Sequence, residues 1–281
     1  MDVLGIIAGG GGLPLAVAES VLASGRDLYV LGLRGCAEPA IGRYPHDWVA
    51  LGESRKLLDL LRAHNCRDVL LCGRVAWPRF SELKLDAKSL TLLPKVLVAA
   101  GRGDDALLKV IVEFLEKEGF HAVGVGEAAP GLLAREGVLG RITPSPGDRN
   151  DIAAAVRVVR RLGELDVGQA AAVCAGLVLA VEAAEGTDAM IARIANLPDS
   201  IRGTVAAPRG VLVKALKPKQ DGKTDLPVIG VETVSRTKAV GLAGIAVESG
   251  KALIVDAPGV IRAADEAGLF VVGFSQEADA D

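Results

Sequence analysis

Short, mostly apolar runs alternate along this chain with longer segments in which apolar residues recur at helical spacing. The short runs predict buried strands at residues 3–8, 27–32, 68–72, 120–125, 169–174, 177–182, 211–216, 242–247, 252–255 and 269–274. The longer segments predict helices at residues 13–22, 53–64, 90–100, 104–117, 151–162, 188–196, 231–240 and 258–267. Strands that alternate with helices in this way predict an α/β protein.

The chain has 281 residues, a length that favours two domains. Pro and Gly cluster at residues 129–131 and again at 143–147, which is typical of a connection. We therefore predict a Rossmann-like N-terminal domain over residues 1–135 and a second α/β domain over residues 136–281, with the ligand in the cleft between them. The two apolar runs 169–174 and 177–182 are expected to be central strands covered on both faces.

Four consecutive glycines, Gly9 to Gly12, stand between the first predicted strand and the first predicted helix. Such a turn presents backbone N–H groups and the positive end of a helix dipole to an anion. Gly10, Gly11, Gly12 and Leu13 are therefore candidate phosphate-binding residues, although a tight turn alone would also explain the glycines.

The glycine turn lacks the full dinucleotide fingerprint. The third glycine position is Pro14 or Leu15, depending on the register, and no acidic residue ends the second strand, which finishes in Leu33-Arg34-Gly35. We expect no NAD.

Two further candidates lie in the N-terminal half. Arg74 follows a predicted strand at its carboxyl end, where open α/β sheets bind ligands, and could meet a phosphate or be an ordinary surface arginine. Asp104 and Asp105 begin a predicted helix, and capping explains one of them, so Asp105 stays a candidate.

Composition narrows the class of protein. The formal net charge of −3 provides no field that would hold nucleic acid, and none of the four cysteines forms a C-x-x-C pair. The start of the chain has no signal-peptide pattern, and the longest uncharged apolar run, 170–181, is too short for a transmembrane helix. We expect a cytoplasmic protein, and the hydrophobic share of 50% leaves room for an apolar ligand groove or a membrane-facing patch.

Three carboxylates stand at and just after the end of the strand predicted at 177–182: Glu182, Glu185 and Asp188. Glu182 ends an apolar run and should be partly buried, so it needs a cation or hydrogen-bond donors. The other two could be solvated turn residues, with Asp188 at a helix N-terminus that Thr187 caps.

A basic segment follows the strand at 211–216. Alternation places Lys214 on the same face as Leu212 and Leu216, and the segment 217–225 then carries further lysines and aspartates. An edge strand with a solvated face would also accommodate Lys214. Pro227 restricts the backbone after Asp225-Leu226.

Together these clusters indicate hydrolysis or transfer at phosphorus. Oxygen ligands suit Mg²⁺ or Mn²⁺ rather than zinc, because the three histidines, His46, His64 and His121, lie far along the chain from the acidic residues. Lysines would neutralise phosphate oxygens, and a carboxylate could activate water.

Five segments in this order resemble one known family, the UDP-2,3-diacylglucosamine pyrophosphatases of the LpxI type. They are Ala8-Gly9-Gly10-Gly11-Gly12-Leu13-Pro14, Gly103-Asp104-Asp105-Ala106-Leu107-Leu108, Asp166-Val167-Gly168-Gln169, the stretch from Val181 to Asp188, and Lys217-Pro218-Lys219-Gln220-Asp221 running on through Thr224-Asp225-Leu226-Pro227-Val228-Ile229-Gly230.

The resemblance implies a Mg²⁺-dependent hydrolase of lipid A assembly that releases UMP and 2,3-diacylglucosamine 1-phosphate, with water attacking the sugar-side phosphorus. It implies that Asp225 is the essential acidic residue. By extension we assign catalysis to Asp225, Asp221 and Lys217, and metal binding to Glu182, Glu185, Asp188 and Asp225. We assign substrate binding to Gly10, Gly11, Gly12, Leu13, Arg74, Asp105, Gln169, Thr187, Lys214, Lys219 and Gln220.

An acylated substrate also implies transient contact with the inner membrane surface, where a peripheral enzyme would meet it, and a homodimer is compatible with the sequence.

Two other classes of protein stay open. A nucleotide-sugar binding or regulatory protein would need the glycine turn but not the acidic and basic clusters, and a metal-dependent transferase would need a second substrate.

Overall fold

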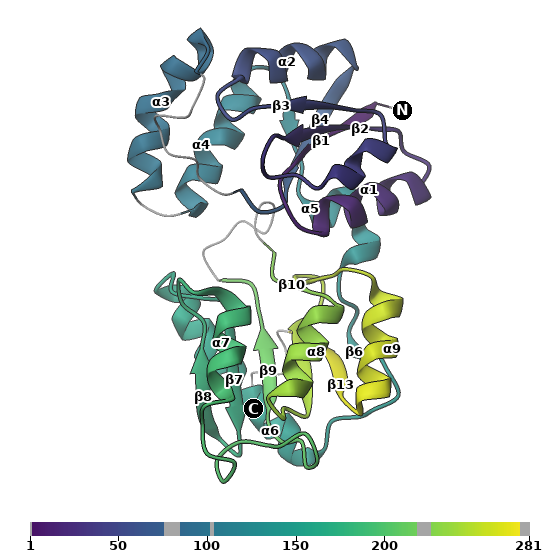
Figure 1. Cartoon of the computed structure of the whole chain (residues 1–281), viewed down its shortest axis with the longest axis vertical. Helices are drawn as coiled ribbons and strands as arrows, with labels where there is room; N and C mark the ends of the chain where they lie inside the picture. The colour runs from purple at the N-terminus through teal and green to yellow at the C-terminus, as the bar shows by residue number, and fades with distance from the viewer. Residues whose placement is uncertain (1, 76–84, 102–103, 218–225, 276–281) are drawn as a thin grey trace. The chain divides into compact units, whose positions relative to one another are not determined.

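The computed structural model describes residues 2–75, 85–101, 104–217 and 226–275. Their contacts divide them into two compact units, which meet in the sequence between residues 131 and 132 and are described here separately (Figure 1). We call them unit 1 and unit 2. Both are α/β, as predicted. Within the described ranges, no helix combines the length and apolar character needed to cross a bilayer.

Unit 1 contains a five-stranded parallel sheet in the order β3-β2-β1-β4-β5. The strands are β1 (Val3–Ala8), β2 (Leu28–Leu33), β3 (His46–Val49), β4 (Cys66–Cys72) and β5 (His121–Ala122). The helices are α1 (Leu13–Ala23), α2 (Ser54–Ala63), α3 (Ala87–Ala100), α4 (Asp104–Lys117) and α5 (Val125–Ala128), with a 3₁₀ turn at Pro39–Arg43.

Helices cover the sheet of unit 1 on both faces. Helices α2 and α4 supply Leu58, Leu61 and Leu115 to a core that also holds Ile7 and Val69 from the strands. Helices α1 and α5 contact each other and the strands β1, β2 and β4. The apolar sequences of β1 and β2 follow from this cover, because strands buried on both faces need apolar residues at every position.

Unit 2 contains a six-stranded mixed sheet in the order β6-β13-β11-β9-β7-β8, beside a separate pair formed by β10 and β12. The strands are β6 (Gly137–Val138), β7 (Ala170–Cys174), β8 (Leu177–Val181), β9 (Val211–Lys214), β10 (Val228–Ile229), β11 (Gly244–Glu248), β12 (Leu253–Ile254) and β13 (Phe270–Phe274). The helices are α6 (Pro146–Glu164), α7 (Gly186–Ile194), α8 (Val231–Ala239) and α9 (Ala257–Ala267).

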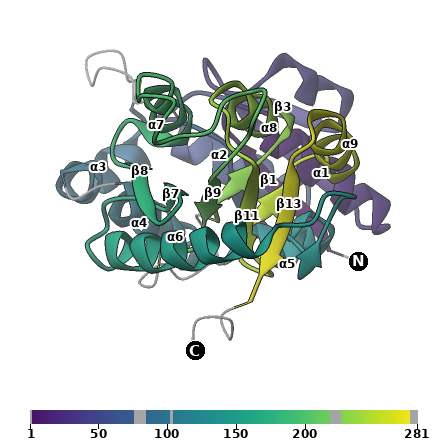
Figure 2. The same cartoon turned by 90° about the horizontal axis from the view of Figure 1, so that it is seen from below.

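The six-stranded sheet separates two apolar layers. Helix α6 lies across one face, where Val156 and Val159 pack with Val211 and Val213 (Figure 2). Residues of α7, α8 and α9 pack on the other face together with Leu212. The alternation predicted along β9 is therefore confirmed, since Leu212 and its two neighbours point to opposite faces.

Some predicted boundaries and positions were wrong. Helix α6 begins at Pro146, not at Asp151, because Ser145 and Asp148 form a capping box and proline suits the first helical turn. Helix α7 begins at Gly186, so Thr187 is not its N-cap.

The expected positions of two strands also need correction. Strand β8 is an edge strand, and its Leu177 and Val178 are 49% and 43% exposed, so it is not covered on both faces. Strand β9 lies inside the sheet and Lys214 is buried, which rules out the solvated edge considered for that lysine.

Candidate functional site

Several predicted site residues of unit 2 lie together along one edge of the six-stranded sheet, namely the edge formed by the ends of its strands. Strand β8 ends just before Glu182 and β9 ends at Lys214, while β7, which runs antiparallel to both, starts just after Gln169. The Glu182 N–H donates to Ala170 O at 2.9 Å, and the Ala215 N–H donates to Gln169 O at 3.1 Å. The chain ends of three strands therefore bring these residues together.

Glu182 is buried, as predicted, and is satisfied by hydrogen-bond donors. Its Oε2 accepts from the Gln169 N–H at 3.1 Å, and its Oε1 accepts from Thr187 Oγ1 at 2.7 Å. The backbone of Gly168 packs directly against that of Glu182, because a Cβ added at Gly168 would lie only 2.1 Å from Glu182 O. Thr187 thus orients a buried carboxylate instead of capping the helix.

The other two carboxylates of this turn are paired with arginines. Glu185 Oε1 lies 2.5 Å from Arg193 Nη2, and Asp188 Oδ1 lies 3.7 Å from Arg236 Nε. Within the described part of the chain, no three His, Cys, Asp or Glu side chains form a group that could hold a metal ion. The assignment of Glu182, Glu185 and Asp188 to a metal stays a prediction, and Asp225, the fourth assigned ligand, lies outside the described residues.

Two lysines extend this edge. Lys214 is 6% exposed, and its Nζ donates to Val228 O at 3.1 Å. This hydrogen bond connects the end of β9 with the start of β10. Lys217 Nζ lies 2.9 Å from Asp166 Oδ1, and its side chain is 16% exposed. Both lysines predicted for this site therefore lie at this edge.

Gln169 supplies an open acceptor at the same edge. Its side-chain Oε1 is buried and has no hydrogen-bond partner among the described residues. A buried acceptor without a donor costs free energy, on the order of 1–3 kcal/mol. A hydroxyl or N–H donor from a bound ligand would remove that cost, which makes Gln169 Oε1 a candidate ligand contact.

A buried ionic cluster lies next to the lysines. Glu248 is 1% exposed and contacts Arg160 Nη2 at 2.9 Å and Lys251 Nζ at 3.0 Å. Glu248 Oε2 also accepts from the Leu216 N–H at 3.1 Å, while Arg160 Nη1 donates to Leu216 O at 3.3 Å. The cluster therefore fixes the backbone directly before Lys217.

In unit 1 the glycine turn leads from β1 into α1. Gly10 forms a bridge with Arg74, in which each residue's N–H donates to the other's carbonyl, at 2.7 and 2.9 Å. Gly9 is required there, because a Cβ would lie 2.5 Å from Arg74 O. Gly11 has φ +87° and its N–H donates to Glu38 Oε1 at 3.3 Å, while Gly12 occupies the N-cap position of α1 and Leu13 the first helical position.

The bridge between Gly10 and Arg74 joins the carboxyl ends of two neighbouring strands. Strand β1 lies between β2, which follows it in the sequence, and β4, which lies on its other side. The strand order therefore reverses at β1, which is where open α/β sheets bind ligands. The structure brings the glycine turn and Arg74 together at this position.

Four predicted site residues, Lys219, Gln220, Asp221 and Asp225, lie outside the described residues, as does the side chain of Asp105. For Asp105 the backbone is described, in the first turn of α4.

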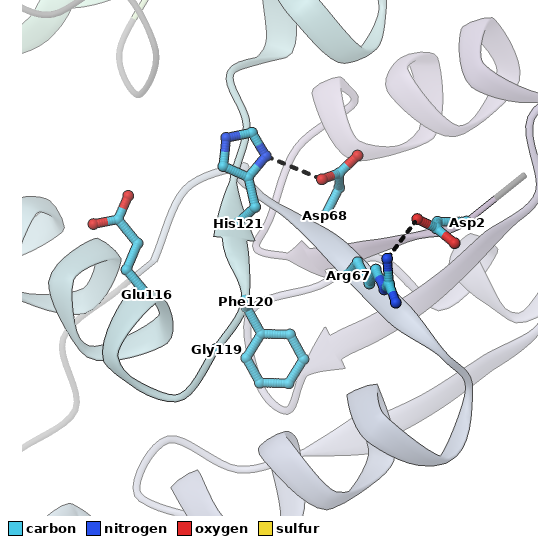
Figure 3. Close-up of a pocket in the computed structure, with 7 residues that line it drawn as sticks. All are labelled: Asp2, Arg67, Asp68, Glu116, Gly119, Phe120 and His121. Carbon is cyan, nitrogen blue, oxygen red and sulfur yellow. Dashed lines mark hydrogen bonds and ion pairs between the residues drawn. The ribbon is translucent and has the colours of Figure 1, made fainter.

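Unit 1 has a hollow, shown in Figure 3, near the amino ends of its strands, whereas the glycine turn and Arg74 lie at their carboxyl ends. It is lined by Asp2, Arg67, Asp68, Glu116, Gly119, Phe120 and His121, which stand at or near the amino ends of β1, β4 and β5. Burial opposes ionisation of Asp68, but hydrogen bonds from Arg26 and His121 outweigh it and hold the pKa of this carboxyl below its usual value. These contacts tie β4, β5 and the start of β2 together, so we regard the hollow as structural.

The family model of the LpxI N-terminal domain matches residues 3–132, and that of the LpxI C-terminal domain matches residues 135–272. The chain belongs to the LpxI family. A relative from Caulobacter vibrioides, named UDP-2,3-diacylglucosamine pyrophosphatase LpxI, is 49% identical over 273 residues, which cover 97% of this chain and 98% of the relative. The resemblance to the LpxI type found in the sequence is thus confirmed at the level of the family.

Sequence reasoning missed three residues of this LpxI chain that surround the lysines. Glu248 ends an apolar strand just as Glu182 does, so the same argument about a buried carboxylate could have found it. Asp166 lies in the segment 166–169 that carries the family resemblance but received no role, and Arg160 gave no signal, because their partners are 51 and 88 residues away in the sequence.

Proposed function

We propose that this chain hydrolyses the pyrophosphate bond of UDP-2,3-diacylglucosamine, giving UMP and 2,3-diacylglucosamine 1-phosphate. The observation that carries the proposal is the 49% identity, over nearly the full length of both chains, to a relative named as a pyrophosphatase of this compound. The chain is accordingly a hydrolase acting on a diphosphate bond.

The proposed reaction is attack of water on the sugar-side phosphorus. A new P–O bond forms to the water oxygen, the P–O bond to the bridging oxygen breaks, and UMP leaves with the bridging oxygen. One proton of the attacking water passes to a base. The sugar 1-phosphate therefore keeps the oxygen that came from water.

The edge of unit 2 supports this chemistry. Lys214 and Lys217 provide positive charge for phosphate oxygens that gain charge as the bond breaks. The free acceptor Gln169 Oε1 suits a hydroxyl or amide N–H of an acylated sugar. We propose that Thr187 acts indirectly, by holding Glu182.

Unit 1 is proposed as a Rossmann-like nucleotide-binding domain. Support comes from the glycine turn Gly10 to Gly12 at the point where the strand order reverses, with Leu13 opening α1 and Arg74 beside it. We propose that the substrate lies in a cleft between the two units, with the nucleotide toward unit 1.

The remaining roles are proposals based on the resemblance in sequence. We propose Asp225 as the essential acidic residue, Asp221 and Lys217 as its catalytic partners, and Asp105, Lys219 and Gln220 as substrate ligands. A cytoplasmic enzyme that visits the inner membrane surface, alone or as a homodimer, would have access to an acylated substrate.

Mg²⁺, or Mn²⁺ in its place, is proposed as the cofactor. The carboxylates Glu182, Glu185 and Asp188 do not by themselves fit a metal, since donors or arginines already occupy them and no metal-binding group exists in the described ranges. A complete site would need Asp225. We therefore assign no step of the reaction to the metal.

The decisive experiment incubates the purified chain with UDP-2,3-diacylglucosamine and Mg²⁺ in water enriched in ¹⁸O. We expect UMP without the label and 2,3-diacylglucosamine 1-phosphate with it. Label in UMP would refute attack at the sugar-side phosphorus. No UMP at all, with the UDP-sugar still bound, would refute hydrolysis and favour a binding protein, and release that requires an added acceptor would favour a transferase.

A further inference from the structure

Helix α3 (Ala87–Ala100) exposes a continuous apolar stripe. Leu90, Leu97 and Val98 are 55%, 46% and 60% exposed, and the exposed Pro94 lies between them in the sequence. These residues are spaced i, i+4, i+7 and i+8, which places them on one side of a helix. The exposed Ala87 and Thr91 belong to the same side at this spacing.

The opposite side of α3 is apolar as well, and other helices cover it. Helix α3 packs on α4 and on α2, and in Figure 1 it is the outermost helix of unit 1, with α4 between it and the sheet. Leu92, Leu93, Val96 and Ala99 are half-buried or buried. A helix that is apolar on both sides is expected to be covered on both, as in a core or at a lipid surface.

The shape and charge of the stripe favour a bilayer as the missing cover. A single outermost helix is convex, so it cannot enclose one acyl chain, whereas a flat lipid surface can lie against it. At 14 residues α3 is too short to span a membrane, but it suits a position in the plane of the interface.

Lys95 stands at the border of the stripe. It is exposed, and its position lets the aliphatic part of the side chain follow the apolar surface while the ammonium group meets anionic headgroups. A symmetric dimer through the stripe would instead place a lysine from each copy in the same interface, which is unfavourable.

We propose that the exposed stripe of α3, formed by Leu90, Pro94, Leu97 and Val98 with Lys95 at its border, docks unit 1 on the surface of an anionic lipid bilayer. The proposal rests on the proposed function for its biological purpose, because a diacylated substrate is held in a bilayer. Its physical basis is the exposure of the stripe, the outermost position of α3 in unit 1 and the exposed Lys95 at the border of the stripe.

The test uses the full chain and sucrose-loaded vesicles of phosphatidylcholine, with and without phosphatidylglycerol. We expect the wild type to sediment with the vesicles, more strongly when phosphatidylglycerol is present. The double variant Leu97→Glu/Val98→Glu should lower the partition coefficient by at least about tenfold, since two apolar contacts are lost and two like charges added. Lys95→Gln should remove most of the increment that phosphatidylglycerol gives.

The matched control is Leu22→Glu on α1, a leucine of the same unit that is 45% exposed and lies outside the stripe. It should leave vesicle binding within about twofold of wild type, and circular dichroism should be unchanged in every variant. UMP release is then compared for substrate in detergent micelles and in vesicles. The double variant should keep the wild-type rate in micelles and lose it on vesicles.

Three outcomes would overturn the proposal: wild type that stays in the supernatant with both vesicle types, a double variant that sediments like wild type, or a control that loses binding equally. A wild-type dimer that the double variant turns into monomers, with vesicle binding unchanged, would assign the stripe to a second copy. Wild type that binds vesicles but releases no UMP from micelles would refute the proposed hydrolysis and leave the lipid contact standing.

Discussion

Neutralising Glu248 should destabilise unit 2 strongly. The carboxylate is almost fully buried and contacts two cations and one backbone N–H: Arg160 at 2.9 and 3.2 Å, Lys251 at 3.0 Å and Leu216 N at 3.1 Å. The variant Glu248→Gln keeps the volume and one acceptor but removes the charge that compensates Arg160. It therefore isolates the electrostatic part of the contact.

The magnitude follows from how far each partner is buried. Removing one member of a buried ion pair costs roughly 3–5 kcal/mol, because the other charge is left without compensation. Arg160 and Lys251 are 20% and 38% exposed, so water can partly hydrate them after the change. We expect a loss of about 2–4 kcal/mol in the free energy of unfolding, below the full range.

Urea denaturation followed by circular dichroism measures this loss. Both tryptophans, Trp48 and Trp77, belong to the N-terminal half of the sequence, so tryptophan fluorescence reports on unit 1 and should change less. Glu232→Gln serves as the matched control, since its ion pair with Arg236 is on the surface of α8 with Glu232 70% exposed. Such a pair contributes at most about 1 kcal/mol. If Glu248→Gln costs no more than this control, the cluster does not stabilise unit 2 as argued.

Three further predictions test the site, and a fourth tests the hydrogen-bonded ion pairs of Asp68 in unit 1. Asp225→Ala should lower UMP release by at least roughly 10²-fold with folding intact, and near-normal turnover would remove its catalytic assignment. Gln169→Leu should raise KM by roughly two- to twelvefold with a smaller change in kcat, because one ligand hydrogen bond of about 0.5–1.5 kcal/mol is lost; an unchanged KM would show that Oε1 does not meet the ligand. Chelation with EDTA should abolish UMP release and added Mg²⁺ should restore it, whereas full activity in EDTA would exclude a metal requirement. Because the pKa of Asp68 is lower in the folded protein than its ordinary value of 3.8, the ionised carboxylate stabilises the fold fully above pH 3.8, and this stabilisation is lost as the pH falls toward the pKa of the folded state. The difference in free energy of unfolding between wild type and Asp68→Asn should therefore shrink between pH 6 and pH 3, and a constant difference would contradict this.

Apolar periodicity was sufficient for most of the fold. Runs such as 3–8 and 269–274 became β1 and β13 with boundaries within a residue, because strands covered on both faces must be apolar throughout. The same reasoning failed where burial is one-sided. Strand β3 contains His46 and Asp47 and was missed as a polar edge strand, while β8 is apolar on both faces and yet lies at an edge.

Local signals in the sequence would have corrected some of these errors. Ser145 and Asp148 stand three residues apart and flank Pro146, which is the pattern of a capped helix start, although the neighbouring prolines and glycine favoured a connection. The partners of the site could not have been found in this way. Lys217 meets Asp166 only because β7 and β9 pair, and no spacing in the sequence specifies that pairing.

Two buried carboxylates of unit 2 hold segments of the protein together, whereas metal binding by Glu182, Glu185, Asp188 and Asp225 stays a prediction. Glu182 and Glu248 each end an apolar strand, and each uses its oxygens to hold backbone N–H groups of a neighbouring segment, at Gln169 and Leu216. A buried carboxylate whose donors belong to the protein is already compensated, so it gains less from a ligand than a group with an open valence does. Two described groups at this edge with capacity for a ligand are the acceptor Gln169 Oε1 and the ammonium of Lys217, which can donate three hydrogen bonds and contacts the Asp166 carboxylate. Glu182 fixes the backbone of Gln169 itself, and Glu248 fixes Leu216, the residue before Lys217. Removal of either carboxylate should therefore reduce substrate affinity, through Gln169 or Lys217, as well as stability.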